Sequence, residues 1–233
     1  MFMSLPHHLS GAQPTGIHPG EPVAQFEIGA YRNFVYLILD WDSKKAAMLD
    51  PQSNLGPVLQ SLATHGFELV AILLTHTHFD HIAGLPELSL LAPQIPVYVH
   101  PFDLHRIDPR LNQNLRLTSL QEGQTISIGS LTTQALHTPG HSAGECCYFL
   151  STSPPYLFTG DTIFIRDCGR TDLSSGSDTE MFASIQKIKT LPPETVILPG
   201  HHYKKECAST LQTELRESPP FQCKTVAELS QLP

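Results

Sequence analysis

No other stretch constrains this chain as strongly as residues 75–81, which read Thr-His-Thr-His-Phe-Asp-His. They follow the apolar run 70–74, which indicates a buried strand, so the polar side chains are expected where that strand ends and a loop begins. On a loop, closely spaced side chains can turn toward one centre, whereas residues along a strand alternate between two faces. Imidazole and carboxylate together are ligands of zinc, iron or manganese, while calcium and magnesium take oxygen ligands. The run therefore predicts a metal site that includes His76, His78, Asp80 and His81.

The rest of the chain predicts sheets covered by helices within one domain. Residues 1–22 are rich in Pro, Gly and His, which indicates a loosely ordered N-terminal arm in front of a single domain over residues 23–233. Helices are expected at 55–65, where Gly66 ends the helix, at 86–91 and at 178–190, and two short helices are expected to close the chain. Short apolar runs predict strands at 34–39, 46–49, 70–74, 97–99, 125–128, 131–136, 146–150, 156–158 and 196–198.

The composition argues against several classes of protein. A formal charge of −8 is unsuited to a broad nucleic-acid-binding surface, which would need a basic excess. Five cysteines without a C-x-x-C pair do not suggest a disulfide framework and favour a reducing compartment. No stretch approaches the roughly 20 apolar residues of a membrane span, and the N-terminus lacks the pattern of a secretory signal. We therefore expect a cytoplasmic protein that binds neither nucleic acid nor membranes.

Three distant residues repeat the pattern of an apolar run followed by a residue of a type that binds metals. His141 lies in Thr-Pro-Gly-His-Ser, Asp161 in Thr-Gly-Asp-Thr, and His201 in Pro-Gly-His-His-Tyr. In each case a glycine, which allows the backbone to turn sharply, precedes the ligand-type residue. One such case would be weak, but four in one chain argue against the alternative of a solvated loop that happens to be rich in histidine. Seven ligands exceed what one tetrahedral ion requires, so two adjacent metal ions are expected.

The combined motifs H-x-H-x-D-H, G-H-S, G-D-T and G-H-x-Y resemble the metallo-β-lactamase superfamily, specifically its glyoxalase II-like branch, over residues 23–215. The resemblance implies an α/β fold, a four-layer αββα sandwich of two mixed sheets flanked by helices, with the metal site at one edge of the sheets. It implies two divalent ions, with zinc favoured and iron or manganese as alternatives. One ion would be bound by His76, His78 and His141 and the other by Asp80, His81 and His201, with Asp161 bridging the two.

The same resemblance implies a metallo-hydrolase that cleaves a glutathione thioester such as S-lactoylglutathione. Two ions lower the pKa of a shared water, and the metal-bridging hydroxide would attack the thioester carbonyl. Asp80 and Asp161 would be the catalytic carboxylates. The departing thiol has a pKa of about 8.5, so it leaves with little help from an acid. The expected partner is therefore a small glutathione conjugate, and a homodimer is compatible with the sequence.

Residues 168–172, Cys-Gly-Arg-Thr-Asp, indicate how glutathione would be held. In glyoxalase II-like enzymes the corresponding Cys-Gly-basic segment contacts glutathione, as does the tyrosine of G-H-x-Y. Arg170 and Tyr203 are thus expected to bind substrate, because Arg can grip a carboxylate with two hydrogen bonds. The alternative is that Arg170 forms a structural ion pair with Asp167 or Asp172.

A second function remains open, because Gly-Arg-Thr-Asp at 169–172 is shared with the persulfide dioxygenases of the superfamily. Those enzymes use one Fe(II) held by two His and a carboxylate, here His76, His141 and Asp161, and would act on glutathione persulfide. The hydrolase is favoured over this alternative.

Three other classes of protein are disfavoured. A non-catalytic relic would have lost ligands, but all seven positions are filled. A nucleic-acid-processing member would carry an inserted domain, and a β-lactamase would carry a secretory signal. The other histidines are interpreted as bystanders, although His202 could support its neighbour His201 through a hydrogen bond.

Overall fold

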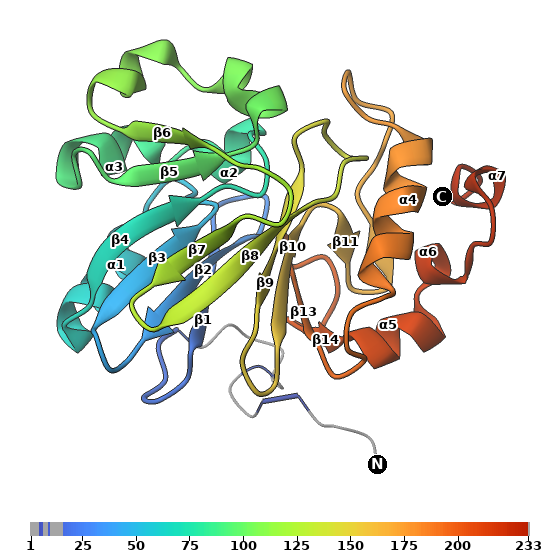
Figure 1. Ribbon diagram of the computed structural model, residues 1–233, viewed down its shortest axis with the longest axis horizontal. Coiled ribbons are helices and arrows are strands. Elements are labelled where there is room, and N and C mark those ends of the chain that lie inside the picture. The colour runs from blue at the N-terminus through green and yellow to red at the C-terminus, as the bar shows by residue number, and fades with distance from the viewer. Residues whose placement is uncertain (1–4, 7–8, 10–15, 233) are drawn as a thin grey trace.

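Two six-stranded sheets pack face to face in the computed structural model, which describes residues 5–6, 9 and 16–232 (Figure 1). The first sheet comprises, in spatial order, β1 (Val23–Ile28), β2 (Asn33–Asp40), β3 (Lys45–Leu49), β4 (Glu68–Leu73), β5 (Pro96–Val99) and β6 (Arg116–Ser119). The second comprises β14 (Ser209–Thr210), β13 (Val196–Pro199), β10 (Tyr156–Gly160), β9 (Cys146–Leu150), β8 (Leu131–His137) and β7 (Thr125–Ile128). A hairpin of β11 (Ile163–Phe164) and β12 (Asp167–Cys168) stands apart. Both sheets are mixed, because β3 to β6 run parallel, as do β10 and β13.

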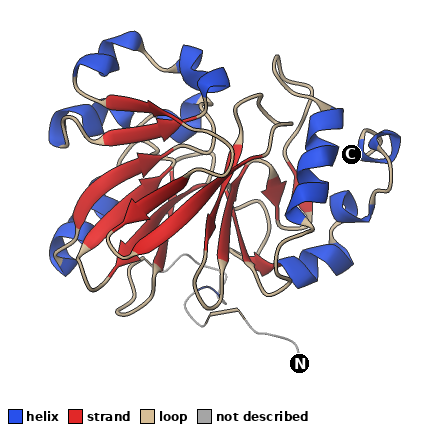
Figure 2. Cartoon of the chain, viewed as in Figure 1, coloured by secondary structure: helices blue, strands red, loops and turns tan. Residues whose placement is uncertain are grey.

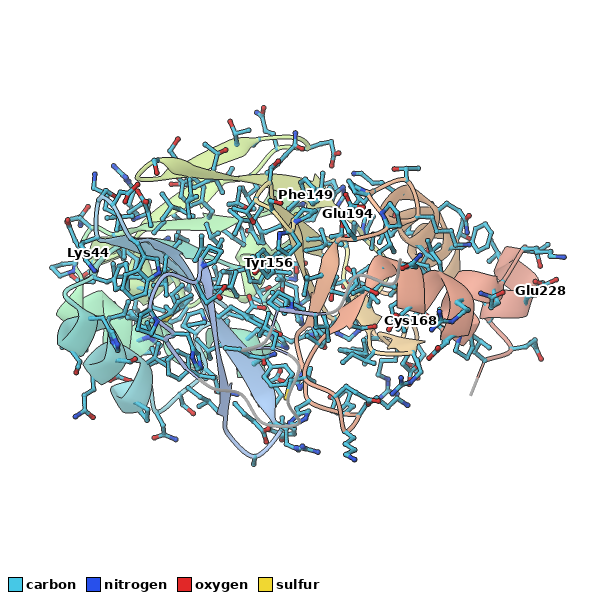
Figure 3. All side chains as sticks on the ribbon, turned by 90° about the horizontal axis from the view of Figure 1, so that it is seen from below. Lys44, Phe149, Tyr156, Cys168, Glu194 and Glu228 are labelled. Carbon is cyan, nitrogen blue, oxygen red and sulfur yellow. The ribbon has the colours of Figure 1, made fainter. Side chains whose placement is uncertain are left out.

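Helices flank the pair of sheets on both sides (Figure 2). Beside the first sheet lie α1 (Gly56–His65), α2 (Phe79–Ile82), α3 (Leu85–Leu91) and the 3₁₀-helices η2 (Pro101–Arg106) and η3 (Pro109–Gln113). Beside the second lie α4 (Asp178–Ile188), α5 (Leu211–Glu217), α6 (Pro219–Gln222) and α7 (Val226–Leu229). Lys44 of the β2–β3 turn and Glu228 of α7 mark opposite ends of the molecule (Figure 3). No described helix combines the length and apolar composition of a membrane span.

Strand β2 shows how the layers are assembled, because all of its residues are buried. Successive side chains of a strand point to opposite faces, so β2 contributes to two cores. Phe34, Tyr36 and Ile38 enter the core between the sheets, whereas Val35, Leu37 and Leu39 pack on the side of α1 and α3. On the far side, α4 covers the second sheet with Met181, Ile185 and Ile188. This arrangement confirms the αββα sandwich predicted from the motifs.

The predicted strands and helices are all present, and their ends differ from the prediction by at most two residues. Strands β1, β6, β11, β12 and β14 were not predicted, because short or edge strands lack a continuous apolar run. Two expectations are corrected. Three short helices, α5 to α7, close the described chain where two were expected, and Asp80 and His81 lie on the single turn of α2 and not on a loop. Of the N-terminal arm, Leu9 is buried between the sheets and Gly16 pairs with Gln25, while residues 1–4, 7–8 and 10–15 lie outside the described chain.

A buried carboxylate at the end of β2 ties the two sheets together. Asp40 accepts hydrogen bonds from the Ser43 hydroxyl (2.5 Å) in the β2–β3 turn of the first sheet and from the backbone N–H of Ser130 (2.7 Å) in the β7–β8 turn of the second. These bonds, that of the Ser43 hydroxyl first, hold the pKa of Asp40 below its usual value. A carboxyl whose pKa is lowered by folding stabilises the fold in its ionised form.

We expect Asp40→Ala to lower the free energy of unfolding at neutral pH by about 2–3 kcal/mol, since charge-assisted hydrogen bonds to two turns are lost. The difference in free energy of unfolding between the variant and the wild type should have its full size above about pH 4, the pKa of the carboxyl in the unfolded chain. It should shrink as the pH falls through the lower pKa of the folded protein. Urea unfolding at several pH values measures it. The exposed neighbour Asp42 is the control, and Asp42→Ala should change stability by less than about 0.5 kcal/mol. Equal losses for both variants would contradict the assigned role.

Candidate metal centre

Seven polar side chains from four separate segments of the sequence meet at one edge of the two sheets. Each comes from the segment that follows a strand: the loop after β4 and helix α2, and the turns after β8, β10 and β13. The structure places them in three overlapping groups whose ligand-type atoms lie within 4.8 Å of one another: His76, His78 and His141; His76, His81 and Asp161; and Asp80, His81 and His201. All seven residues predicted from sequence are thus brought together. All are buried except His78, which is half-buried.

Asp161 lies between the other members of the cluster. Its Oδ2 is 3.5 Å from the Nε2 of His141 and 3.4 Å from the Nε2 of His201, while its Oδ1 is 3.5 Å from the Nε2 of His81. Its carboxylate therefore faces both the group that contains His141 and the group that contains His81 and His201. The Oδ2 of Asp80 is likewise 3.5 Å from the Nε2 of His201.

Hydrogen bonds to the Nδ1 atoms fix how the imidazoles face the centre. Nδ1 of His81 lies 3.1 Å from the Asp50 carboxylate, that of His141 lies 2.8 Å from the Arg170 carbonyl, and that of His201 lies 2.9 Å from the Tyr31 carbonyl. Since carboxylate and carbonyl oxygens only accept, each Nδ1 must carry a proton and donate. The Nε2 atom of each ring is then the one left to bind a metal, as expected when ligating histidines are held by outer hydrogen bonds.

The inward-facing atoms lack partners that the described protein could supply. Nε2 of His76 and Oδ1 of Asp161 are buried without a hydrogen bond among the described residues. The Nε2 atoms of His81 and His201 are 3.1 Å apart although both Nδ1 atoms already donate, so a proton or a metal cation must lie between them. Two nitrogens bound to one tetrahedral zinc at about 2.05 Å would be roughly 3.3 Å apart. The residues therefore fit divalent metal ions.

The charges of the cluster shift the pKa values of its members in opposite directions. Burial, and next the charge of His81, lower the pKa of His76 well below its usual range. Burial also acts to lower the pKa of His81, but the Asp161 and Asp50 carboxylates outweigh it and raise this pKa to about 10. Burial acts to raise the pKa of Asp161, yet the imidazoles of His81 and His201 hold it well below the usual carboxyl range. The Asp161 carboxylate thus needs positive charge beside it, and a bound metal would supply that charge while displacing the His81 proton.

Several supporting residues were not predicted from the sequence. Asp50, at the end of β3, accepts from the backbone N–H of Thr75 (2.8 Å) and the hydroxyl of Thr75 (2.6 Å) as well as from His81, so it holds the start of the histidine loop. The side-chain amide of Asn33 donates to the Asp80 carboxylate at 3.0 Å. Asp50 does carry the signal of an acid directly after an apolar strand, whereas Asn33 gives no such signal because it begins a strand.

The glycines beside the candidate ligands are explained by close packing as well as by backbone conformation. Gly160 adopts φ +50°, and a Cβ atom there would lie 2.5 Å from the Thr75 hydroxyl oxygen. The chain bends at Gly200 as predicted, but without a positive φ, so the backbone conformation alone does not require glycine there. A Cβ atom at Gly200 would instead lie 2.4 Å from Oδ1 of Asp161. Only glycine leaves room for the carboxylate.

A cavity of about 560 Å³ opens beside His141 and Asp161 and is the natural place for a substrate. Arg170 and Tyr203 both line it. The Arg170 guanidinium is bound to the Asp172 carboxylate through two hydrogen bonds (2.6 and 2.7 Å), so the structural pairing considered for this residue is present. Both partners are well exposed, and such pairs contribute little stability, so a substrate carboxylate could replace Asp172. The Tyr203 ring stacks on His201 with 4.7 Å between ring centroids.

His202 does not support His201 as the sequence suggested it could. Its side chain is buried and its Nδ1 contacts Arg32 (2.9 Å) and the carboxylate of Glu27, while its backbone N–H donates to the Arg32 carbonyl. These bonds attach the segment after β13 to the β1–β2 turn, which carries the carbonyl of Tyr31 that binds His201. His202 therefore shapes the surroundings of the centre through the backbone.

Comparison with known proteins places this geometry in context. A family model described as the metallo-beta-lactamase superfamily matches residues 28–201. The chain is 37% identical to a hydroxyacylglutathione hydrolase of Enterobacter sp. (strain 638), over 73% of this chain but only 62% of that protein. It is 35% identical to the probable polyketide biosynthesis zinc-dependent hydrolase PksB of Bacillus subtilis (strain 168), over 82% of this chain and 83% of that protein. The crystal structure of ETHE1 from Myxococcus xanthus superposes with a TM-score of 0.75 at 27% identity, over 91% of this chain and 92% of that one.

Proposed function

Since the chain belongs to the metallo-beta-lactamase superfamily, with relatives in its glyoxalase II-like branch, we propose that it is a metal-dependent hydrolase that cleaves a glutathione thioester, with S-lactoylglutathione as the first substrate to test. The observation that carries the proposal is the complete set of seven inward-facing ligand-type side chains beside an open cavity. The hydroxyacylglutathione hydrolase relatives support the choice of substrate.

The proposed centre holds two divalent ions. His76, His78 and His141 would bind one, Asp80, His81 and His201 the other, and Asp161 would bridge them. Zinc is the metal we propose, with iron or manganese as alternatives, and the zinc-dependent hydrolase among the relatives supports zinc. When bound, such ions lower the pKa of a shared water and polarise a carbonyl oxygen.

The protein's own contribution is to hold and orient these groups. The Nδ1 donors keep the imidazoles turned inward, and Asn33 fixes the Asp80 carboxylate. Asp161 and Asp80 are the carboxylates we propose to act at the reacting centre. In the adjoining cavity, Arg170 would bind a carboxylate of glutathione after release of Asp172, and Tyr203 would contact the same glutathione moiety. Because a thiolate is a good leaving group, no further acid is required.

A persulfide dioxygenase with one Fe(II) is the second candidate. The Gly-Arg-Thr-Asp segment at residues 169–172 favours it, and the similarity to ETHE1 keeps it open. In that case His76, His141 and Asp161 would form the triad of ligands, and the Nε2–Oδ2 distance of 3.5 Å between His141 and Asp161 is compatible with a shared ion.

One experiment separates the two candidates. Metal content is measured on protein purified without added metal, and turnover of S-lactoylglutathione is compared in air and under argon. We expect two metal ions per chain and equal rates of thioester hydrolysis in both atmospheres. A single iron per chain, with oxygen consumption on glutathione persulfide and no thioesterase activity, would overturn the hydrolase in favour of the dioxygenase.

A further inference from the structure

We propose that Glu145 is a positioning residue of the metal centre, whose buried carboxylate holds His76 and Asp161 from behind and so determines how tightly the centre binds its cations. The inference rests on the proposed dinuclear centre. Glu145 is not itself a candidate ligand, because its carboxylate lies on the outer side of the two residues it contacts.

The contacts of Glu145 place it directly behind the cluster. The residue immediately precedes β9 and is fully buried. Its Oε1 accepts the backbone N–H of Asp161 at 2.9 Å and lies 3.5 Å from Nδ1 of His76. The adjacent N–H of Cys146 donates to the carbonyl of Thr75, which fixes this segment against the histidine loop. One carboxylate thus contacts a proposed ligand and the proposed bridge.

The proton on Nδ1 of His76 explains why a carboxylate matters at this position. The Thr75 hydroxyl donates to Asp50 at 2.6 Å, so its oxygen, 3.1 Å from Nδ1 of His76, can only accept. Nδ1 therefore carries a proton that faces both Thr75 and Glu145, and Nε2 remains free for a metal. A carboxylate near the N–H side of a ligating imidazole makes the other nitrogen a stronger ligand and fixes the ring orientation.

The incomplete hydrogen bonding of the buried Glu145 carboxylate also supports a role beside the metal centre. Its Oε2 is buried and has no hydrogen-bond partner among the described residues. A buried acid that is only partly bonded destabilises a protein unless a nearby positive charge compensates it. Two divalent cations on the far side of His76 and Asp161 would supply that compensation.

Glu214 provides a matched control within the same chain. It is also fully buried, it also accepts a backbone N–H (Arg166, 2.8 Å), and it also has one carboxylate oxygen without a partner among the described residues. It lies on α5, where it binds the β11–β12 turn, and not on a segment that carries a candidate ligand. Replacing either glutamate by glutamine removes a buried charge and keeps an oxygen to accept the N–H.

The test compares the zinc affinity of Glu145→Gln and Glu214→Gln with that of the wild type. Each protein is first stripped of metal, and its affinity is measured by competition with a chromophoric chelator. Circular dichroism checks that each variant folds. We expect Glu145→Gln to weaken zinc binding about 10- to 100-fold and Glu214→Gln to leave it within twofold. Equal affinities for Glu145→Gln and wild type, or equal losses for both variants, would overturn the proposal.

A second variant keeps the test decisive if Glu145→Gln does not fold. Glu145→Asp retains the charge but withdraws it from His76, and zinc binding at least threefold weaker than wild type is expected, whereas unchanged affinity would overturn the role of Glu145. Failure of the proposed function is recognised separately. It would appear as a wild type that does not bind two zinc ions, or that binds them without hydrolysing a thioester.

Discussion

Asp161→Ala is expected to remove metal from the protein and to abolish turnover. The carboxylate of Asp161 faces both proposed groups of ligands, with His141 on one side and His81 and His201 on the other. Its loss therefore affects both proposed ions together. Since loss of a residue that merely supports a ligand costs 10- to 100-fold in metal affinity, loss of the bridge should exceed about a hundredfold.

Tyr203→Phe is the control for Asp161→Ala. This change removes one hydroxyl from the same cavity and keeps the ring that stacks on His201, so both metals should remain bound. One lost hydrogen bond to substrate would raise KM by roughly 10-fold at most. Metal content by plasma mass spectrometry and steady-state hydrolysis of S-lactoylglutathione give the comparison. An Asp161→Ala protein that kept both metals and most of its turnover would show that the assigned bridge is wrong.

The clustering of the seven side chains could be predicted because each follows an apolar segment closely. The strand before the histidine loop is a continuous apolar run, and the glycines before His141, Asp161 and His201 mark the same change from strand to turn. The αββα arrangement followed from the resemblance of these motifs to a known family, since periodicity alone did not indicate how the strands are ordered. The individual ligand roles remain predictions that metal analysis must test.

The supporting residues could not be predicted, since their function depends on contacts across the fold. Glu145 precedes an apolar strand, as many exposed acids do, and only the tertiary structure brings it against His76 and Asp161. Asp50 is followed by a proline and is typical of a turn, yet it holds His81. The state of Arg170 was also undetermined, because a nearby acid can pair with it or leave it free for substrate, and the structure shows Asp172 bound to it.

We expect Gly200→Ala to disrupt the metal centre almost as severely as loss of Asp161, although it removes no ligand. The added Cβ atom would lie 2.4 Å from Oδ1 of Asp161 and 2.9 Å from the carbonyl oxygen of Gly160. The backbone cannot move aside freely, because the Gly200 N–H donates to Gly160 at 2.7 Å and the Gly200 carbonyl accepts from Phe34 at 2.8 Å. The carboxylate must therefore be displaced, at a cost of about 1–3 kcal/mol in stability for the overpacking.

Gly56→Ala isolates this steric effect from the general consequences of replacing glycine. Gly56 begins α1 in front of Pro57, and a Cβ atom there would meet nothing within 4 Å beyond its two chain neighbours, so the substitution should change stability by less than about 1 kcal/mol and leave metal binding unchanged. If the packing around Asp161 controls the centre, zinc titration and thermal unfolding should show weaker zinc binding and lower stability for Gly200→Ala but not for Gly56→Ala. If Gly200→Ala bound two zinc ions with wild-type affinity, the carboxylate would have to be free to move, and the rigid bridge proposed for Asp161 would not exist.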